Sequence, residues 1–435
     1  MVKNMMKILL VVAGLLYMSS CTTAYAAVKK SKHPDKLVIW WAQWAPADGL
    51  QKVAAEFAKA EGIPVEVKQI PWPEFQIKAF QEFGNKVTDF DILIGDSQWL
   101  GKAAQEGWYV DLTEFVKKGG VDMSDIAPSI SKYLCKTADG KIWAAPCEPD
   151  AIGIVYRADL FKKHGIKKPK TWYDILAAAQ KIHKADKKIN GWVSPAFGDG
   201  DATTMTYQNF LYAFGGKWGN VKGGKYTAKG VVNSKEAVQA LDFYKKLLAT
   251  SSPELAKAGY GGSLEKFTNG STAICMTFFA FFPGIAEVGA KKKWDLEYMP
   301  IPPLKEGAKA IASLGGQGFS ISTKTSKKKQ DLAKKFISWF NKKETQMKWI
   351  ENPGCFTCSK SVMNDPKYIT KSPYNKAFKE SLPILVDFWN IPEYAELLNA
   401  VQEHLPEAMS GKKTSKRALN DIAKKHQATF DKKNK

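Results

Sequence analysis

The chain has 435 residues, of which 45% are hydrophobic and 25% are charged, and this composition is that of a globular protein with a large core. The length exceeds what one compact domain usually holds, so at least two structural units are expected. The formal net charge is +21, but the lysines are scattered over every segment, which argues against a nucleic-acid-binding protein and leaves attraction to an anionic surface as an alternative.

Residues 1–26 have the pattern of an export signal. Lys3 and Lys7 precede an apolar run over residues 8–18, which is too short to span a bilayer, and residues 24–26 form an A-x-A cleavage site. An alternative is lipid attachment at Cys21, which ends a Met-Ser-Ser-Cys sequence similar to a lipoprotein box. Both interpretations place the mature protein in the periplasm or outside the cell.

Strand and helix patterns alternate after the leader. Strands are predicted over residues 37–41, 63–70 and 90–94, with helices over residues 49–60 and 75–83 between them. This order predicts a parallel sheet covered by helices. Because ligands bind beyond the carboxyl ends of such strands, the loops after the three strands are expected to share one rim.

The first strand ends in aromatic residues that suit a binding cleft. Trp40 and Trp41 belong to the strand, and Gln43 and Trp44 follow it. Indole faces with an amide edge predict a site for a ligand that has apolar faces and hydroxyl edges. The alternative for each aromatic side chain is burial in the core, and for Trp40 we favour that alternative.

A second α/β unit follows near residue 146. Pro146 and Pro149 separate two predicted strands over residues 141–145 and 152–156, which indicates a crossing between two lobes. Residues 301–303 end a later strand and predict a second crossing. The predicted lobes are residues 27–147 with 303–341, and residues 148–302 with 342–435. Further helices are predicted from the N-cap Thr171 and over residues 203–213, 234–249, 329–341, 343–350, 393–409 and 416–430.

Five cysteines remain after the leader, and their odd number leaves at least one thiol unpaired. Cys355 and Cys358 have C-x-x-C spacing, but they follow a turn after a helix. We therefore expect a loop staple or unpaired thiols in place of a redox centre. No second close pair of Cys or His accompanies them, so zinc is not expected.

Several segments match a known family in order and spacing. They are residues 90–94, 140–146, 156–172, 214–216, 267–273 with the pattern F-x-N-G-x-x-A, and 333–346. The chain thereby resembles the extracellular solute-binding proteins of bacterial ABC importers, in the sugar-binding branch related to maltose-binding protein. The resemblance implies a two-lobed α/β periplasmic-binding-protein fold, with a mainly parallel sheet flanked by helices in each lobe and multiple hinge crossovers. It also implies a monomer without cofactor or catalysis, which delivers one small solute to a membrane permease.

The resemblance also implies positions in the cleft. Asp96 to Trp99 occupy a ligand-contacting turn, and Asp150 stands where a family carboxylate often accepts sugar hydroxyls. Phe281 lies in a segment that commonly carries a stacking Trp, and Gln317 stands where many members have Trp, which suggests a more polar site for a small sugar or polyol. The predicted ligand-binding residues are Trp41, Gln43, Trp44, Asp96, Trp99, Asp150, Phe281 and Gln317, with Trp192, Phe197, Asp199, Asp201 and Trp389 as further candidates.

Two other functions are weighed against a sugar binder. The net positive charge is compatible with an anionic solute such as a sugar phosphate, but the predicted cleft is rich in Asp and Trp and lacks Arg. Asp96 and Asp150 could instead converge as the paired carboxylates of a glycan-processing enzyme. A G-x-x-x-x-G-K sequence over residues 219–225 is followed by Tyr226, where a P-loop needs Ser or Thr, so a nucleotide site is not expected.

Overall fold

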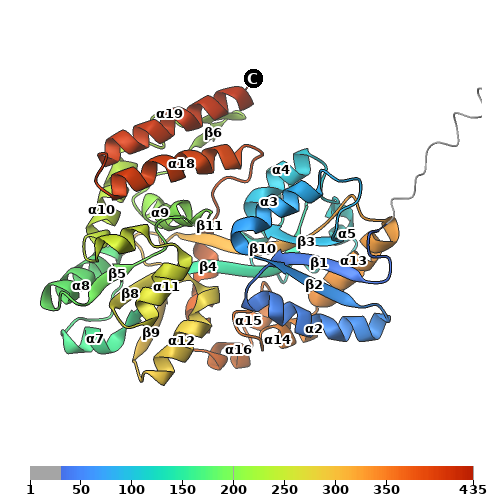
Figure 1. The fold of residues 1–435 in the computed structure, drawn as a ribbon, viewed down its shortest axis with the longest axis horizontal. Helices are drawn as coiled ribbons and strands as arrows, with labels where there is room; N and C mark the ends of the chain where they lie inside the picture. The colour runs from blue at the N-terminus through green and yellow to red at the C-terminus, as the bar shows by residue number, and fades with distance from the viewer. Residues whose placement is uncertain (1–30, 199, 435) are drawn as a thin grey trace, which may run out of the picture.

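The computed structural model describes residues 31–198 and 200–434, so the predicted export signal, Cys21 and Asp199 lie outside the described residues. Two α/β lobes stand side by side (Figure 1). Lobe 1 is built on β1 (Leu37–Ala42), β2 (Val65–Ile70) and β3 (Ile92–Asp96). Lobe 2 is built on β5 (Asn190–Val193), β8 (Thr272–Phe278) and β9 (Leu296–Pro300), with a small hairpin of β6 (Asn220–Lys222) and β7 (Lys225–Thr227).

Helices surround both sheets (Figure 1). Those of lobe 1 are α2 (Ala45–Glu61), α3 (Trp72–Glu82), α4 (Leu100–Gln105), α5 (Thr113–Lys117) and α13 (Lys327–Phe340). Those of lobe 2 are α7 (Ala158–Lys163), α8 (Trp172–Ala185), α9 (Ala202–Ala213), α10 (Lys235–Leu248), α11 (Tyr260–Thr268), α12 (Phe282–Lys291), α18 (Tyr394–Met409) and α19 (Ser415–Lys433). The short elements near the boundary are α6 (Pro128–Tyr133), α14 (Lys343–Trp349), α15 (Lys360–Met363), α16 (Pro366–Lys371), α17 (Asn375–Ser381) and β11 (Leu385–Val386).

Two long antiparallel strands join the lobes. β4 (Ala145–Arg157) and β10 (Ala312–Ile321) lie between the two sheets and make one continuous sheet of order β2-β1-β3-β10-β4-β8-β5, with β11 on β10 and β9 on β4. The pairs β1–β2, β1–β3 and β5–β8 are parallel, as predicted, whereas β4 and β10 are antiparallel to β8 and β3 respectively. The sheet is therefore mixed at the lobe boundary.

The predicted interruption of the strand near residue 146 is wrong, because β4 runs unbroken through both prolines. Pro146 pairs with Gly318 and Pro149 with Gly316, on either side of a register shift in β10. A proline is tolerated in a strand at such an irregularity, since no regular ladder hydrogen bond needs its missing N–H. The second passage lies within β10 itself, and residues 301–303 belong to the loop before it.

The C-terminal part contacts both lobes. Helix α14 packs on α2 of lobe 1, although residues 342–435 were predicted to belong to lobe 2. Helices α18 and α19 pack on each other and on α9 and α10 of lobe 2. After α13 the chain therefore still contacts lobe 1 through α14, and it packs on lobe 2 at α18 and α19.

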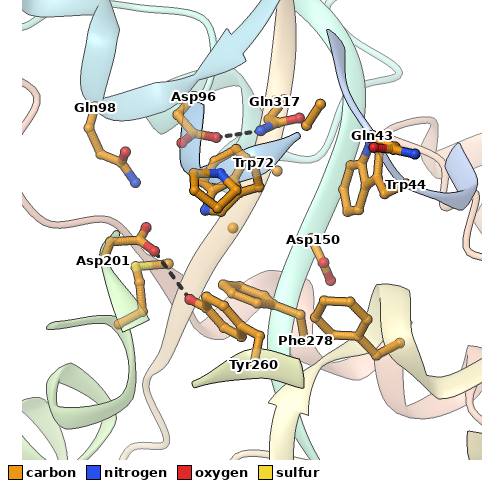
Figure 2. A pocket seen from close by; sticks show the side chains of 16 residues that line it. Gln43, Trp44, Trp72, Asp96, Gln98, Asp150, Asp201, Tyr260, Phe278 and Gln317 are labelled. Carbon is orange, nitrogen blue, oxygen red and sulfur yellow. Dashed lines mark hydrogen bonds between the residues drawn. The ribbon is translucent and has the colours of Figure 1, made fainter. Parts of the chain in front are cut away.

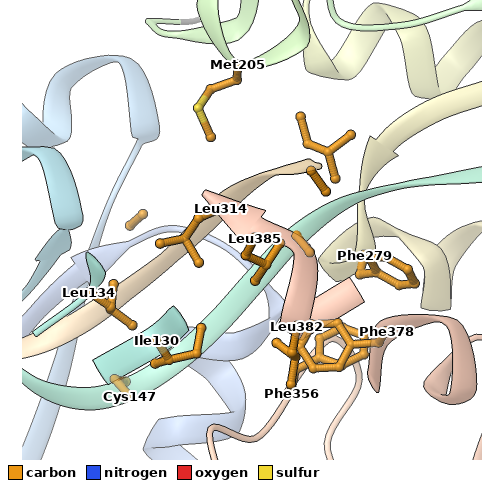
Figure 3. Packing of buried hydrophobic residues seen from close by; sticks show 14 of the residues in the cluster. Ile130, Leu134, Cys147, Met205, Phe279, Leu314, Phe356, Phe378, Leu382 and Leu385 are labelled. Atoms are coloured by element: carbon orange, nitrogen blue, oxygen red, sulfur yellow. The ribbon is translucent and has the colours of Figure 1, made fainter. Parts of the chain in front are cut away.

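Buried apolar side chains tie the crossing strands to the rest of the chain (Figure 3). Leu314 of β10 and Cys147 of β4 are buried in the same hydrophobic cluster as Phe279, Phe356 and residues of α6 and α17. The rings of Phe356 and Phe378 lie 4.2 Å apart between centroids. Segments from the middle and the C-terminal third of the chain therefore share one core beneath the crossing.

The five described cysteines are all buried and unpaired. Of the two interpretations of Cys355 and Cys358, the structure has unpaired thiols. The predicted N-cap Thr171 is confirmed, because its hydroxyl accepts the Asp174 N–H at 3.2 Å in a capping box. Within the described residues, no helix has the length and apolar character needed to cross a membrane.

Candidate functional site

A cavity of about 290 Å³ lies between the lobes beside the crossing strands (Figure 2). Side chains of both lobes and of β4 and β10 converge on it. Its lining residues are Ala42, Gln43, Trp44, Trp72, Pro73, Asp96, Gln98, Asp150, Asp201, Met205, Tyr260, Phe278, Phe281, Gly315, Gly316 and Gln317.

The wall from lobe 1 is formed where its three parallel strands end. Gln43 and Trp44 follow β1, Trp72 begins α3 just after β2, and Asp96 ends β3. Carboxyl ends of parallel strands meet at one edge of a sheet, which is why residues far apart in the sequence lie together here. The side chain of Trp44 is half-buried and Gln43 is exposed, so both are available to a ligand.

Gln317 links two of these strand ends from the neighbouring strand β10. Its Nε2 donates to Asp96 Oδ1 at 2.7 Å, and its Oε1 accepts the indole N–H of Trp41. Gln317 and Asp96 are register partners in the β10–β3 ladder. Burial raises the pKa of Asp96 well above its usual value, the nearby carboxyl of Asp201 raises that pKa further, and the Gln317 amide opposes the shift.

Asp150 forms the floor of the cavity on β4. Its side chain is 2% exposed, and its Oδ1 accepts the backbone N–H groups of Ala151 at 2.7 Å and Ala280 at 3.4 Å. Burial raises the pKa of Asp150, against the effect of these amides. Glu148 lies two residues earlier on the same strand and is fully buried, and its burial together with the Asp150 charge raises the pKa of the Glu148 carboxyl well above its usual value.

Lobe 2 supplies a further carboxylate and three rings. Asp201 precedes α9 and accepts the Tyr260 hydroxyl at 3.1 Å. Burial raises the pKa of Asp201 to about 6, while this hydrogen bond opposes the rise. The Tyr260 ring lies 5.7 Å from Phe278 and 6.2 Å from Phe281, with interplanar angles of 37° and 34°.

The structure brings together six of the eight predicted ligand-binding residues. Gln43, Trp44, Asp96, Asp150, Phe281 and Gln317 all line the cavity, as does the further candidate Asp201. Trp41 lies behind the wall, fully buried, with its ring edge-on to Trp44 at 5.5 Å. It contacts the site through Trp44 and Gln317.

Trp99, Trp192 and Trp389 lie elsewhere. Trp99 is buried against Phe75 and Phe80, because the short helical turn after β3 directs its ring into lobe 1. Trp192 is fully buried in lobe 2, where its indole donates to Ser194. Two other further candidates are also absent from the cavity lining. Trp389 borders a separate cavity of about 440 Å³ beside Trp218, and Phe197 is exposed on the loop before α9.

Besides Ala42 and Pro73, four side chains of the cavity were not predicted from the sequence: Trp72, Met205, Tyr260 and Phe278. Gln98 lies within the predicted turn from Asp96 to Trp99, and a signal existed for Trp72, since it follows a strand whose end was placed on the rim. Phe278 ends β8, three residues before Phe281. Nothing local marks Tyr260, whose place depends on how α11 packs.

The chemistry of this site is that of recognition. Carboxylates and amides offer hydrogen bonds, and aromatic rings offer flat apolar faces. In the described part of the chain, no group of three or more His, Cys, Asp or Glu side chains is arranged to hold a metal ion.

A fold of two α/β lobes with a ligand-sized cavity between them defines a solute-binding protein. Residues 41–347 match the family of bacterial extracellular solute-binding proteins, and the chain belongs to this family. It is 29% identical to a probable ABC transporter-binding protein of Deinococcus radiodurans, over 72% of this chain and 74% of the relative. It is 23% identical to the maltodextrin-binding protein MdxE of Bacillus subtilis, over 94% of both chains.

A solved structure shows the same fold. The ABC transporter solute-binding protein of Agrobacterium radiobacter K84, in complex with ribitol, superposes with a TM-score of 0.77 at 25% identity. The similarity covers 91% of this chain and 98% of the other. The predicted family and two-lobed fold are thereby confirmed.

Proposed function

We propose that the protein captures one small sugar or polyol outside the cytoplasm and delivers it to the membrane permease of an ABC importer. The observation that carries this proposal is the cavity lining, in which flat rings from both lobes alternate with carboxylates and amides. A sugar or polyol presents C–H surfaces to such rings and hydroxyls to such acceptors. The relatives named as a maltodextrin binder and as a ribitol complex support the same class of solute.

The size of the cavity favours a small solute. A volume of about 290 Å³ is at the lower end of what ligand sites usually provide. We therefore favour a solute of monosaccharide size over a long oligosaccharide. Delivery to a permease, export by residues 1–26 and a monomeric state belong to the same proposal.

An anionic solute is disfavoured by the same lining. None of the described residues that border the cavity is Lys, Arg or His, whereas Asp96, Asp150 and Asp201 all border it. A phosphate group would meet carboxyls without a compensating cation, at a high desolvation cost.

The test is a binding screen read by intrinsic tryptophan fluorescence, since Trp44 and Trp72 border the cavity. The panel holds pentitols, hexitols, ketohexoses, disaccharides, their amino derivatives and sugar phosphates. At least one sugar or polyol, amino derivatives included, should shift the emission and raise the melting temperature without being converted. Binding of sugar phosphates alone, or turnover of a bound glycoside, would contradict the proposal.

A further inference from the structure

The charge of the cavity is opposite to the charge of the protein. The chain carries 64 Lys and Arg residues against 43 Asp and Glu. Yet the described lining of the cavity contains three carboxyls and no basic side chain. In a chain with so many Lys and Arg residues, a cavity lining without any basic side chain is a specific feature of this cavity.

The three carboxyls are buried without a counter-charge. Asp150, Asp96 and Asp201 are 2%, 8% and 9% exposed, respectively. Their hydrogen bonds come from backbone amides and from the side chains of Gln317, Tyr260 and Gln98, and none of the described Lys, Arg or His side chains forms an ion pair with them. Ionised carboxylates enclosed without a cation are costly, so burial favours their protonated form, and a neutral solute supplies no charge that would reverse this preference.

Other charged groups around the cavity are acidic too. Asp387 follows β11, and its charge raises the pKa of Asp96 and of Asp201. The charge of Asp150 likewise raises the pKa of Glu148 on the same strand. The charged groups that act on the cavity carboxyls from neighbouring elements are thus acidic, and they oppose ionisation of these carboxyls until a cation is present.

The rings of the cavity suit a cation as well as a sugar face. Tyr260, Phe278 and Phe281 form one tilted group from lobe 2, and Trp44 and Trp72 stand on the side of lobe 1 (Figure 2). An ammonium group near an aromatic face gains electrostatic attraction, and an adjacent carboxylate adds a charge-assisted hydrogen bond. Gln43 remains for hydroxyls, whereas Gln98 interacts with Asp201.

We infer that the solute carries a protonated amine beside its hydroxyls, as in an amino sugar or an amino polyol. Asp201 holds the ammonium group, Asp150 on β4 accepts hydroxyls, and the surrounding rings cover the C–H groups of the solute. This inference deepens the proposed function and rests on it. A protonated amine would favour the ionised carboxyls, so the raised pKa values of Asp96, Asp150 and Asp201 should fall on binding and protons should pass to the buffer.

The experiment compares matched pairs of probes that differ in one amine: glucamine with sorbitol, and glucosamine with glucose. Isothermal titration calorimetry of the full mature chain should give at least about tenfold tighter binding of the amine in one pair, the value of one hydrogen bond to a charged group. Repeating the titration in buffers of different ionisation enthalpy should reveal proton release for that amine. Its affinity should rise as the pH increases from about 5 to about 7, because the pKa of Asp201 is about 6.

Two variants locate the effect. Asp201→Asn keeps the shape of the side chain and removes its charge, so it should weaken the binding of the amine by about tenfold and the binding of sorbitol by much less. Asp150→Asn should weaken the binding of both members of a pair to a similar extent. Asp331→Asn removes an exposed acid that pairs with Lys327 far from the cavity lining, and it should change neither affinity. Thermal unfolding of each variant shows whether it is folded. If Asp150→Asn does not fold, Asp201→Asn alone tests the inference.

Three results would overturn the inference: equal affinity within both pairs, tighter binding of the neutral members, or binding of neither pair. In the first two cases the neutral members bind, so the proposed capture of a sugar or polyol stands. In the third, the wider screen of sugars and sugar phosphates decides that proposal separately. A loss for sorbitol as large as that for glucamine in Asp201→Asn would also contradict the assignment of the ammonium to this carboxyl.

Discussion

Gln317 and Asp96 face each other across the β10–β3 ladder, and the amide of Gln317 donates to Asp96 Oδ1 at 2.7 Å. β10 is a crossing strand, whereas β3 belongs to lobe 1. The same amide group accepts the buried indole N–H of Trp41. One side chain therefore orients an acid of the cavity and satisfies a tryptophan behind it.

Gln317→Leu should destabilise the protein, because it leaves the Trp41 N–H and an Asp96 oxygen without their partner. Two buried groups that lose a hydrogen bond cost about 2–4 kcal/mol together. Urea unfolding followed by circular dichroism measures the loss. Gln105→Leu, at an exposed position of α4, is the control and should stay within about 0.5 kcal/mol of the parent. Equal stability of the two variants would show that the hydrogen bonds of Gln317 to Asp96 and Trp41 do not stabilise the fold.

Gly316→Ala tests the crossing itself. Gly316 has φ of +97°, and a Cβ added there would lie 2.4 Å from the Glu148 carbonyl oxygen and 2.6 Å from the Asp150 nitrogen. Both contacts are with the backbone of β4, which cannot move aside cheaply, so a loss of more than about 2 kcal/mol is expected. Gly284→Ala is the control, because its Cβ would meet nothing within 4 Å in helix α12. There, alanine should be neutral or stabilise by up to about 1 kcal/mol.

The rim of lobe 1 was predictable because it follows from local periodicity. Alternating strand and helix patterns fix where strands end, and parallel strands place those ends together. Gln43 and Trp44 were located in this way, and the loop that contains Asp96 was placed on the same rim before the resemblance assigned it a ligand contact. Asp150 and Gln317 came from the family resemblance, since a residue in the middle of a crossing strand carries no local mark of its role.

Residue type alone did not show which way an aromatic side chain points. Trp44 and Trp99 both follow strands at the rim, yet only Trp44 borders the cavity, while Trp99 turns into the core. Trp192 is likewise a core residue of lobe 2. Tyr260 was missed because its position depends on how helix α11 packs against strand β8, and the local sequence around Tyr260 does not show this packing.

The two tryptophans that follow strands at the rim allow a direct comparison. Trp44→Ala should weaken the binding of the best solute of the screen by about tenfold or more. It should cost little stability, because the ring is half-buried at the cavity. Trp99→Ala should cost about 3–5 kcal/mol of stability, since its ring is packed in the core, and it should leave the affinity of the folded fraction unchanged. Calorimetry and urea unfolding of both variants separate the two effects. The reverse pattern would exchange the roles assigned to these residues.

Glu148 should make the stability depend on pH. Its carboxyl is fully buried, and neither oxygen has a hydrogen-bond partner among the described residues. Its pKa is raised in the folded protein above the usual 4.5, so its favourable contribution is complete below that pH and is lost as the pH rises through the folded value.

Glu148→Gln removes this titration. Relative to the parent, the variant should gain stability with rising pH, on the order of 1–3 kcal/mol between about pH 4 and about pH 8. Glu236→Gln, an exposed acid of α10, is the control. Urea unfolding at several pH values measures both. A difference between Glu148→Gln and the parent that stays constant over the whole pH range would contradict a buried, protonated Glu148.

The two lobes should close around a bound solute. Residues of lobe 1, lobe 2 and both crossing strands border one cavity, so a solute held by Trp44 on one side and Tyr260 on the other stabilises the arrangement in which both touch it. Small-angle scattering at a saturating concentration of the best solute should give a smaller radius of gyration than the empty protein. Trp44→Ala at the same solute concentration should reduce this change in proportion to its lost occupancy. An unchanged radius with binding confirmed by calorimetry would mean that the lobes do not move, and a permease would then have to recognise the loaded protein by something other than its shape.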